Sequence, residues 1–321
     1  MKVVVTGVAG FLGSHLADRL LEQGYRVIGI DNFSSGRIEN LSRAMSRQSF
    51  QLIEADLLEP SRWIDAFRAD IVFHFAANPE VRHSVKEPMD HYHQNLTTTM
   101  NVLEAARRRG VSLIVFASSS TVYGDAEKIP TPEEHPLKPI SVYGATKAAA
   151  EIMCQTYSRL YGLKCLILRY ANIVGPRLRH GVIYDFIIKL KKNPGELEIL
   201  GDGTQRKSYL YVDDAIEATL KATEKIMNEE LRDRVYNVGN HDWITVLDIA
   251  NSVVKAMKLQ GVRYVFKPAT PDGRGWPGDV KLMLLDIRRI MRETGWKPRY
   301  SSLEAVERTA KELVRELGVS P

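Results

Sequence analysis

The sequence predicts an α/β fold with a doubly wound parallel sheet and a smaller C-terminal α/β lobe. Runs rich in β-branched residues alternate with stretches of helical periodicity over the first half of the chain. Several of these runs are apolar throughout, as strands covered on both faces are. At 321 residues the chain is also longer than one compact core requires, so a second lobe is expected.

The first predicted strand leads into a glycine loop. Val3–Val5 is followed by Gly7, Gly10 and Gly13, and helical apolar spacing comes next. Glycines let a backbone approach a diphosphate, and the free N–H groups at a helix start favour its negative charge. We predict a phosphate-binding loop of Rossmann type; the alternative is a turn that needs glycine only for its own geometry.

The second predicted strand ends in Asp31, eighteen residues after Gly13. A carboxylate at this place bonds the ribose hydroxyls of adenosine and repels a 2′-phosphate, so NAD is predicted in preference to NADP. Two alternatives stay open. Asp31 could be a solvated residue that starts a turn, and Arg37 could meet a 2′-phosphate.

The next two predicted strands also end near candidate contacts. Phe50–Leu57 contains Asp56, which either bonds an adenine amino group or caps a helix. A short helix around Ser61–Phe67 leads to a strand over Asp70–Ala77. The small pair Ala76 and Ala77 would let a cofactor lie close, because ligands of such sheets collect at the carboxyl ends of strands.

The rest of the chain divides into a return to the sheet and a second lobe. We expect an NAD-binding domain over 1–176 with a return segment at 212–240, and a substrate lobe over 177–211 and 241–321. A cleft between them would lie over the strand ends. The further elements expected are helices at 90–109, 141–161, 183–190 and 212–227 and strands at 111–117, 164–170 and 234–238.

One helix carries a candidate base. Tyr143 and Lys147 are four residues apart and therefore lie one turn apart on one face, and they follow a hydroxyl cluster that includes Ser119. An ammonium nearby, with a positive nicotinamide ring, would lower the tyrosine pKa to ~7, low enough for a general base. Ser119 would bond the reacting oxygen. The implied reaction removes a proton from an alcohol as a hydride passes to NAD.

Composition limits the other classes of function. The net charge of +5 comes from 44 basic and 39 acidic residues that are mostly scattered, so no nucleic-acid partner is predicted. Met1 runs directly into the first strand and no apolar run reaches spanning length, which predicts a cytoplasmic protein without a membrane partner. Cys154 and Cys165 read as core residues. His91 and His93 are expected on a helix surface, and no metal site is predicted.

These motifs together resemble the extended short-chain dehydrogenase/reductase family, and within it the UDP-glucose 4-epimerases. The resemblance covers essentially the whole chain. The motifs that carry it are Gly7-x-x-Gly10-x-x-Gly13, Asp31, the serines before Val122-Tyr123-Gly124, Tyr143-x-x-x-Lys147 and Arg169-Tyr170-x-Asn172.

The resemblance implies an NAD-dependent epimerase that interconverts UDP-galactose and UDP-glucose through a 4-keto sugar. Tyr143, Lys147 and Ser119 would be catalytic. The cofactor contacts would be Gly7, Gly10, Phe11, Leu12, Gly13, Asp31, Asn32, Ser34, Ser35, Gly36, Asp56, Leu57, Phe75, Ala76, Ala77, Asn95, Tyr143, Lys147 and Tyr170. The UDP-sugar contacts would be Ser119, Tyr143, Asn172, Val182, Ile183, Arg206, Lys207, Tyr209, Arg274 and Asp279.

Two departures from the family pattern concern the diphosphate of the substrate. Lys207, beside Arg206, stands where the family usually has an arginine, and a lysine gives a point charge without a fork. Trp276 replaces a second arginine, with Arg274 two residues earlier.

Several alternatives share the Tyr/Lys pair. They are an epimerase of UDP-glucuronate or of UDP-N-acetylhexosamine, a sugar 4-reductase, and an NAD-binding scaffold without turnover. Dehydration is not expected, because related 4,6-dehydratases place Asp-Glu where this chain has Ser120 and Thr121. The helices at 90–109 and 141–161 are candidates for a homodimer interface, although helices that only flank the sheet would look the same.

Overall fold

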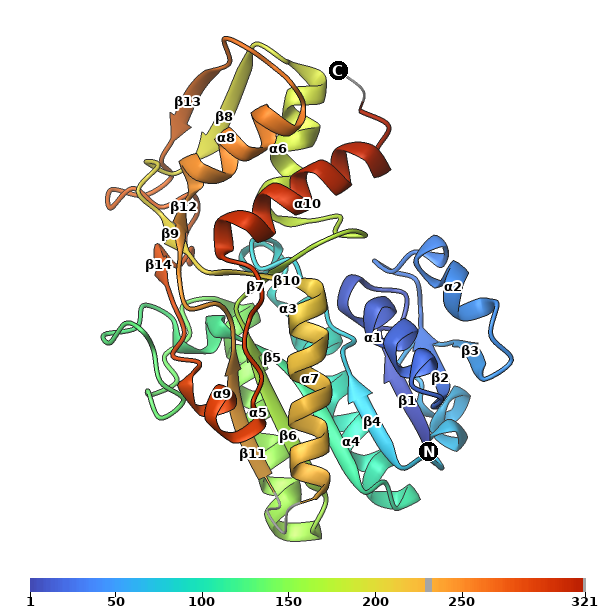
Figure 1. Cartoon of the computed structure of the whole chain (residues 1–321). Helices are drawn as coiled ribbons and strands as arrows, with labels where there is room; N and C mark the ends of the chain where they lie inside the picture. The colour runs from blue at the N-terminus through green and yellow to red at the C-terminus, as the bar shows by residue number, and fades with distance from the viewer. Residues whose placement is uncertain (229–232, 320–321) are drawn as a thin grey trace.

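The computed structural model describes residues 1–228 and 233–319 and confirms the predicted fold class (Figure 1). Within that part of the chain, seven parallel strands form one sheet in the order β11-β6-β5-β4-β1-β2-β3. Its strands are β1 (Lys2–Thr6), β2 (Arg26–Asp31), β3 (Phe50–Glu54), β4 (Ile71–His74), β5 (Leu113–Ser119), β6 (Lys164–Tyr170) and β11 (Asp233–Val238).

The strand order reverses between β1 and β4. The chain runs outward from β1 through β2 to β3, then returns to place β4 on the other side of β1. Ligands of open α/β sheets bind at the carboxyl ends of strands beside such a reversal. The helices packed around the sheet are α1 (Phe11–Glu22), α2 (Ser42–Met45), α3 (Pro88–His91), α4 (Thr98–Arg109), α5 (Val142–Tyr161), α7 (Val212–Met227) and α9 (Arg288–Thr294).

Both faces of the sheet are buried, as the continuous apolar runs predict. Alternate side chains of a strand point to opposite faces, so Val3 and Val5 join one hydrophobic cluster with α1 and α7 while Val4 joins another with α4 and α5. The first cluster continues into the C-terminal lobe, where it includes Ile249 and Leu313. One core therefore runs from the sheet into the lobe.

The lobe gathers at one end of the sheet, at the top of Figure 1. Its strands pair as β12-β9-β14 and β13-β8, and β7 pairs with β10 beneath them. The elements are β7 (Asn172–Val174), α6 (Gly181–Lys192), β8 (Glu196–Leu200), β9 (Arg206–Lys207), β10 (Tyr209–Tyr211), β12 (Ile244–Thr245), α8 (Val246–Ala256), β13 (Arg263–Lys267), β14 (Leu282–Met283) and α10 (Ser302–Glu316).

The chain does not stay in the lobe after residue 241. Helix α9 packs on α7 and β11, and the Trp296 indole N–H donates to the carbonyl oxygen of Asp214 at 3.0 Å. Segments expected in the substrate lobe thus contact the sheet domain, and the division into two domains stays a prediction.

The predicted elements differ from the observed ones mainly at their ends. The helical stretch expected over 90–109 exists, but Tyr92–Thr97 forms a π-helical turn between α3 and α4. Thr99 donates its hydroxyl proton to the carbonyl oxygen of Asn95 at 2.5 Å within this turn. Two 3₁₀ turns, Pro60–Arg62 and Ile64–Phe67, replace the short helix expected around 61–67.

Candidate active site

The glycine loop lies against the end of β4. Gly7 has φ +68°, and a Cβ placed on it would lie 2.7 Å from the backbone of Ala76. A Cβ on Gly13 would lie 2.1 Å from the carbonyl oxygen of Gly7. Helix α1 starts after Gly10 without a side-chain cap, so its first N–H groups face the loop. This tight, uncapped helix start fits the diphosphate of NAD.

Asp31 holds this loop together. Its 8% exposed carboxylate accepts hydrogen bonds from the amides of Ala9 and Phe33, both at 2.8 Å. Burial raises the pKa of Asp31, and the two amides oppose that rise. Arg37, the residue that could have met a 2′-phosphate, forms an exposed ion pair with Glu39. The contact of the Asp31 carboxylate with ribose hydroxyls stays a prediction.

The strand neighbouring β2 adds a second carboxylate on the same edge. Asp56 accepts from the Asn32 side-chain amide at 2.9 Å and from the Leu58 amide at 2.8 Å. The bond to Leu58 closes a local turn, so Asp56 stabilises the backbone after β3. Its contact with adenine stays a prediction. A hollow of about 410 Å³ adjoins this region, lined by Phe33, Gly36, Arg37, Ile38, Glu39 and Glu54.

Other predicted cofactor residues line the neighbouring strand ends. Phe75 and Tyr170 face each other with ring centroids 6.1 Å apart, and the Tyr170 hydroxyl is hydrogen-bonded to Thr219 at 2.6 Å. Asn95 is 2% exposed and accepts from the amide of Asn78 at 2.7 Å. Burial and these bonds fix the side chains of Tyr170 and Asn95, while Phe75 is half-buried and packs on the Tyr170 ring.

The three candidate catalytic residues come together where β5 ends and α5 begins. Ser119 is the last residue of β5, and its hydroxyl oxygen accepts from the Thr121 hydroxyl at 3.0 Å. The Ser141 side chain caps α5, whose first turns carry Tyr143 and Lys147. The Lys147 ammonium donates to the carbonyl oxygen of Ala117 at 2.8 Å and lies 5.9 Å from the centroid of the Tyr143 ring.

Burial shifts the pKa values of both titratable residues of this group. Burial raises the pKa of Tyr143 to about 12, although its hydrogen bond with Ser119 lowers it. Burial also lowers the pKa of Lys147 to about 8, while the nearby carboxylate of Glu151 raises it. The low tyrosine pKa was expected with the nicotinamide ring in place, and it stays a prediction for the NAD-bound protein; in the chain alone desolvation is the largest influence on the pKa. A phenolate here requires a further positive charge, such as that of oxidised nicotinamide.

The substrate residues expected around the diphosphate lie in the lobe. Lys207 and Asp279 form an ion pair of 2.7 Å, and the Asp279 side chain is only 2% exposed. Arg206 is exposed, and because neighbours in a strand point to opposite faces, it leaves β9 on the face opposite Lys207. Arg274 donates to Asp125, to Asp272 and to the Asp279 carbonyl oxygen.

The remaining candidate substrate residues are spread around β7, β10 and α6. The Asn172 side-chain amide donates to the carbonyl oxygen of Ser208 at 3.0 Å, and Tyr209 is 6% exposed on β10. Val182 is half-buried, whereas Ile183 is 1% exposed and its side chain belongs to the hydrophobic core. The contact of Ile183 with a substrate stays a prediction.

Comparison with known proteins identifies the family. The sequence model of the NAD dependent epimerase/dehydratase family matches residues 3–239. The chain belongs to this family. It is an epimerase, and NAD is its cofactor.

Relatives match over almost the entire chain. A putative UDP-glucose 4-epimerase of Methanocaldococcus jannaschii is 34% identical over 95% of this chain and 96% of its own. A crystal structure of a UDP-galactose 4-epimerase is 53% identical with a TM-score of 0.89, covering 99% of this chain and 100% of its own. A UDP-glucuronic acid 4-epimerase from Bacillus cereus, solved with a substrate analogue and NAD, is 29% identical, with a TM-score of 0.89 and coverages of 99% and 100%.

In the described residues no three His, Cys, Asp or Glu side chains lie together as possible metal ligands. The expectation that His91 lies on a helix surface was wrong. His91 is fully buried, its ring lies edge-on to Tyr143 at 6.1 Å, and His93 alone is exposed. The polar neighbours of His91 in the sequence predicted a surface position. The π-helical turn and the packing of α3 on α5 bury its side chain instead.

The two cysteines lie in the core, as predicted. Cys154 and Cys165 are buried free thiols.

In the described part of the chain no helix is long and apolar enough to cross a membrane.

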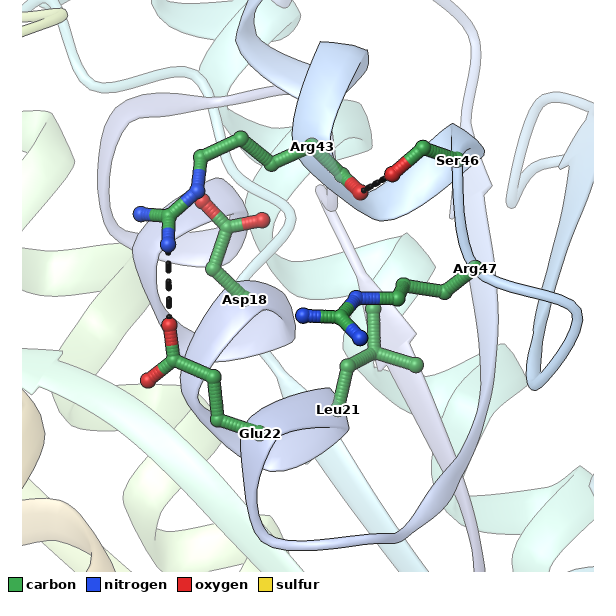
Figure 2. Close-up of a pocket in the computed structure, with 6 residues that line it drawn as sticks. All are labelled: Asp18, Leu21, Glu22, Arg43, Ser46 and Arg47. Carbon is green, nitrogen blue, oxygen red and sulfur yellow. Dashed lines mark hydrogen bonds and ion pairs between the residues drawn. The ribbon is translucent and has the colours of Figure 1, made fainter.

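A cavity of about 210 Å³ lies apart from the strand ends, between α1 and α2 (Figure 2). Asp18, Leu21 and Glu22 line it from the second half of α1, and Arg43 from α2 forms an ion pair with Glu22 at 3.0 Å. The α1 residues among them are remote from the first turn of that helix, where the cofactor contacts are predicted. This cavity is not part of the candidate site.

The buried ammonium of Lys147 is expected to lower the free energy of unfolding. We expect Lys147→Met to raise the free energy of unfolding at pH 7 by about 1–3 kcal/mol while abolishing turnover, because the variant removes a desolvated ammonium. The folded-state pKa near 8 lies below the unfolded value, so the wild-type penalty is complete below pH 8 and disappears as pH rises to about 10.5. Urea unfolding at pH 7 and pH 10 checks this. An equal difference at both pH values would contradict it.

Proposed function

We propose that the chain interconverts UDP-galactose and UDP-glucose by inverting C4 of the sugar. The observation that carries the proposal is the meeting of Ser119, Tyr143 and Lys147 where β5 ends and α5 begins, with no carboxylate in the two positions after Ser119. Thr121 instead donates its hydroxyl proton to Ser119. Relatives named as UDP-glucose or UDP-galactose 4-epimerases support this substrate.

In the proposed reaction, Tyr143 as phenolate takes the proton of the 4-hydroxyl, and Ser119 holds that oxygen by a hydrogen bond. NAD, held at the glycine loop and by Asp31, would supply the hydride acceptor and donor for C4 when bound. Lys147, anchored on the Ala117 carbonyl, keeps a positive charge beside the tyrosine ring that stabilises the phenolate. The 4-keto sugar turns in the site, and Tyr143 returns the proton after reduction of the opposite face.

The same proposal covers the binding residues predicted above, including Asp31 for the adenosine ribose and Lys207 with Asp279 for the nucleotide-sugar. We also propose a cytoplasmic protein of galactose metabolism that forms a homodimer through α4 and α5. Outward-facing apolar residues of α5 support the dimer: Ile152 is 55% exposed and Leu160 is 67% exposed.

The test is turnover of UDP-galactose by the purified protein, with and without added NAD, measured as UDP-glucose formed. We expect conversion in both conditions, because the proposed reaction regenerates NAD in each cycle and needs only the cofactor that stays bound. UDP-glucuronate and UDP-N-acetylglucosamine at the same concentration are the matched controls. Faster turnover of either control than of UDP-galactose would reject the proposed substrate.

A further inference from the structure

We propose that Arg82, in the loop after β4, is the second cation that binds the diphosphate of the nucleotide-sugar, together with Lys207. This inference rests on the proposed function, since it assigns a residue to that substrate. The juxtaposition that carries it is two cations from distant segments, both set against the indole of Trp276.

Lys207 alone does not match the charge of a diphosphate. Its ammonium already forms a 2.7 Å ion pair with Asp279, so the pair brings no net charge to a ligand that carries at least two negative charges. Arg274 is no substitute. Its guanidinium is only 20% exposed and bonds two carboxylates, Asp125 and Asp272. A further positive group is needed on the same side of the lobe.

Arg82 meets this need. Its guanidinium carbon lies 6.0 Å from the centroid of the Trp276 ring, and the Lys207 ammonium lies 5.6 Å from the same centroid. The side chain of Arg82 is exposed, and among residues 1–228 and 233–319 no carboxylate lies within ion-pair distance of it. The ring holds the arginine by a cation–π contact and leaves its donor fork available.

Trp276 adds a donor beside the two cations. The indole N–H is buried, and it has no hydrogen-bond partner in the described part of the chain. A buried donor without a partner is costly, and an anionic oxygen would satisfy it. Arg82, Trp276 and Lys207 therefore form a diphosphate-binding group in which the indole sets the position of both cations.

The location of Arg82 also fits the reaction. Its loop begins at Phe75–Ala77, which lies against the glycine loop, whereas Trp276 and Lys207 belong to the lobe. A diphosphate held between them would bridge the sheet domain and the lobe and place the sugar over the strand ends. Arg82 thus contributes to positioning the substrate and does not take part in the chemistry.

The test compares Arg82→Ala and Arg82→Lys with Lys86→Ala, a matched control that removes an exposed cation from the same segment. Calorimetric titration of the NAD-loaded proteins uses UDP and UMP as probes. For Arg82→Ala we expect the Kd of UDP and the KM of UDP-galactose to rise about tenfold with kcat nearly unchanged, the loss of one charge-assisted contact. UMP, which lacks the second phosphate, should lose less, and Arg82→Lys should recover part of the UDP affinity.

Three outcomes would overturn the inference: equal losses for UDP and UMP, equal effects of Arg82→Ala and Lys86→Ala, or no UDP binding by the wild type. The proposed function fails separately. If the wild type binds UDP with the expected dependence on Arg82 but does not convert UDP-galactose, the diphosphate assignment stands and the substrate assignment does not.

Discussion

Replacing Tyr143 by phenylalanine is expected to reduce turnover of UDP-galactose by about 10³-fold, within the range that a general base contributes. The variant keeps the ring, its edge-on packing with His91 and the 5.9 Å separation from Lys147, and it loses only the hydroxyl. NAD should therefore stay bound. Turnover and the absorbance of bound cofactor, measured on the same sample, check both halves of the prediction.

Tyr161→Phe is the matched control, because Tyr161 lies at the other end of the same helix and is 52% exposed. It should leave turnover unchanged. If Tyr143→Phe keeps more than about a tenth of wild-type turnover, another group must take the proton, and the assignment of the base fails.

Glu151→Ala should lower the free energy of unfolding by about 3–5 kcal/mol, the usual cost of leaving a buried charge without its partner. Glu151 is 1% exposed, and its carboxylate pairs with the Arg169 guanidinium at 2.6 Å and accepts from the Ser118 hydroxyl. Arg169 also donates to the Tyr123 hydroxyl at 2.8 Å. These bonds join α5, β5 and β6 directly beneath Ser119 and Lys147. Urea unfolding measures the loss.

Two further variants separate the buried charge from the general effect of mutation. Glu22→Ala removes exposed ion pairs with Arg19 and Arg43 and should cost less than about 1 kcal/mol. The double variant Glu151→Met with Arg169→Met should recover much of the loss, because it leaves no unpaired charge. A double variant as unstable as Glu151→Ala would show that the network acts through its geometry and not through charge pairing.

Local sequence patterns predicted the elements that build the site. The glycine spacing, the apolar runs and the helix start at Ser141 depend on neighbouring residues, so Tyr143 and Lys147 could be placed on one helix face without a structure. The motifs that carry the family resemblance are local as well, so the family could be predicted from them, and the family model confirms it. The roles of the individual site residues stay predictions.

Contacts between distant segments could not be predicted. Lys207 and Asp279 are 72 residues apart in the sequence. The contact of Arg82 with Trp276 joins a loop of the sheet domain to a segment of the lobe. An exposed arginine in a loop has no periodicity to distinguish it. The raised pKa of Tyr143 in the chain alone could not be predicted either, because desolvation depends on the packing around the ring, which no spacing reveals.

The position of β11 has a consequence for how the protein is made. This strand is the edge partner of β6, yet β6 ends at Tyr170 and β11 begins only at Asp233. A growing chain emerges from the ribosome in sequence order, so the edge of β6 stays uncovered while the intervening residues are synthesised. An uncovered strand of buried, apolar residues such as Leu166 and Leu168 is a template for wrong pairing. The newly made protein is therefore exposed to wrong strand pairing during that interval, and we expect chaperones to bind it there.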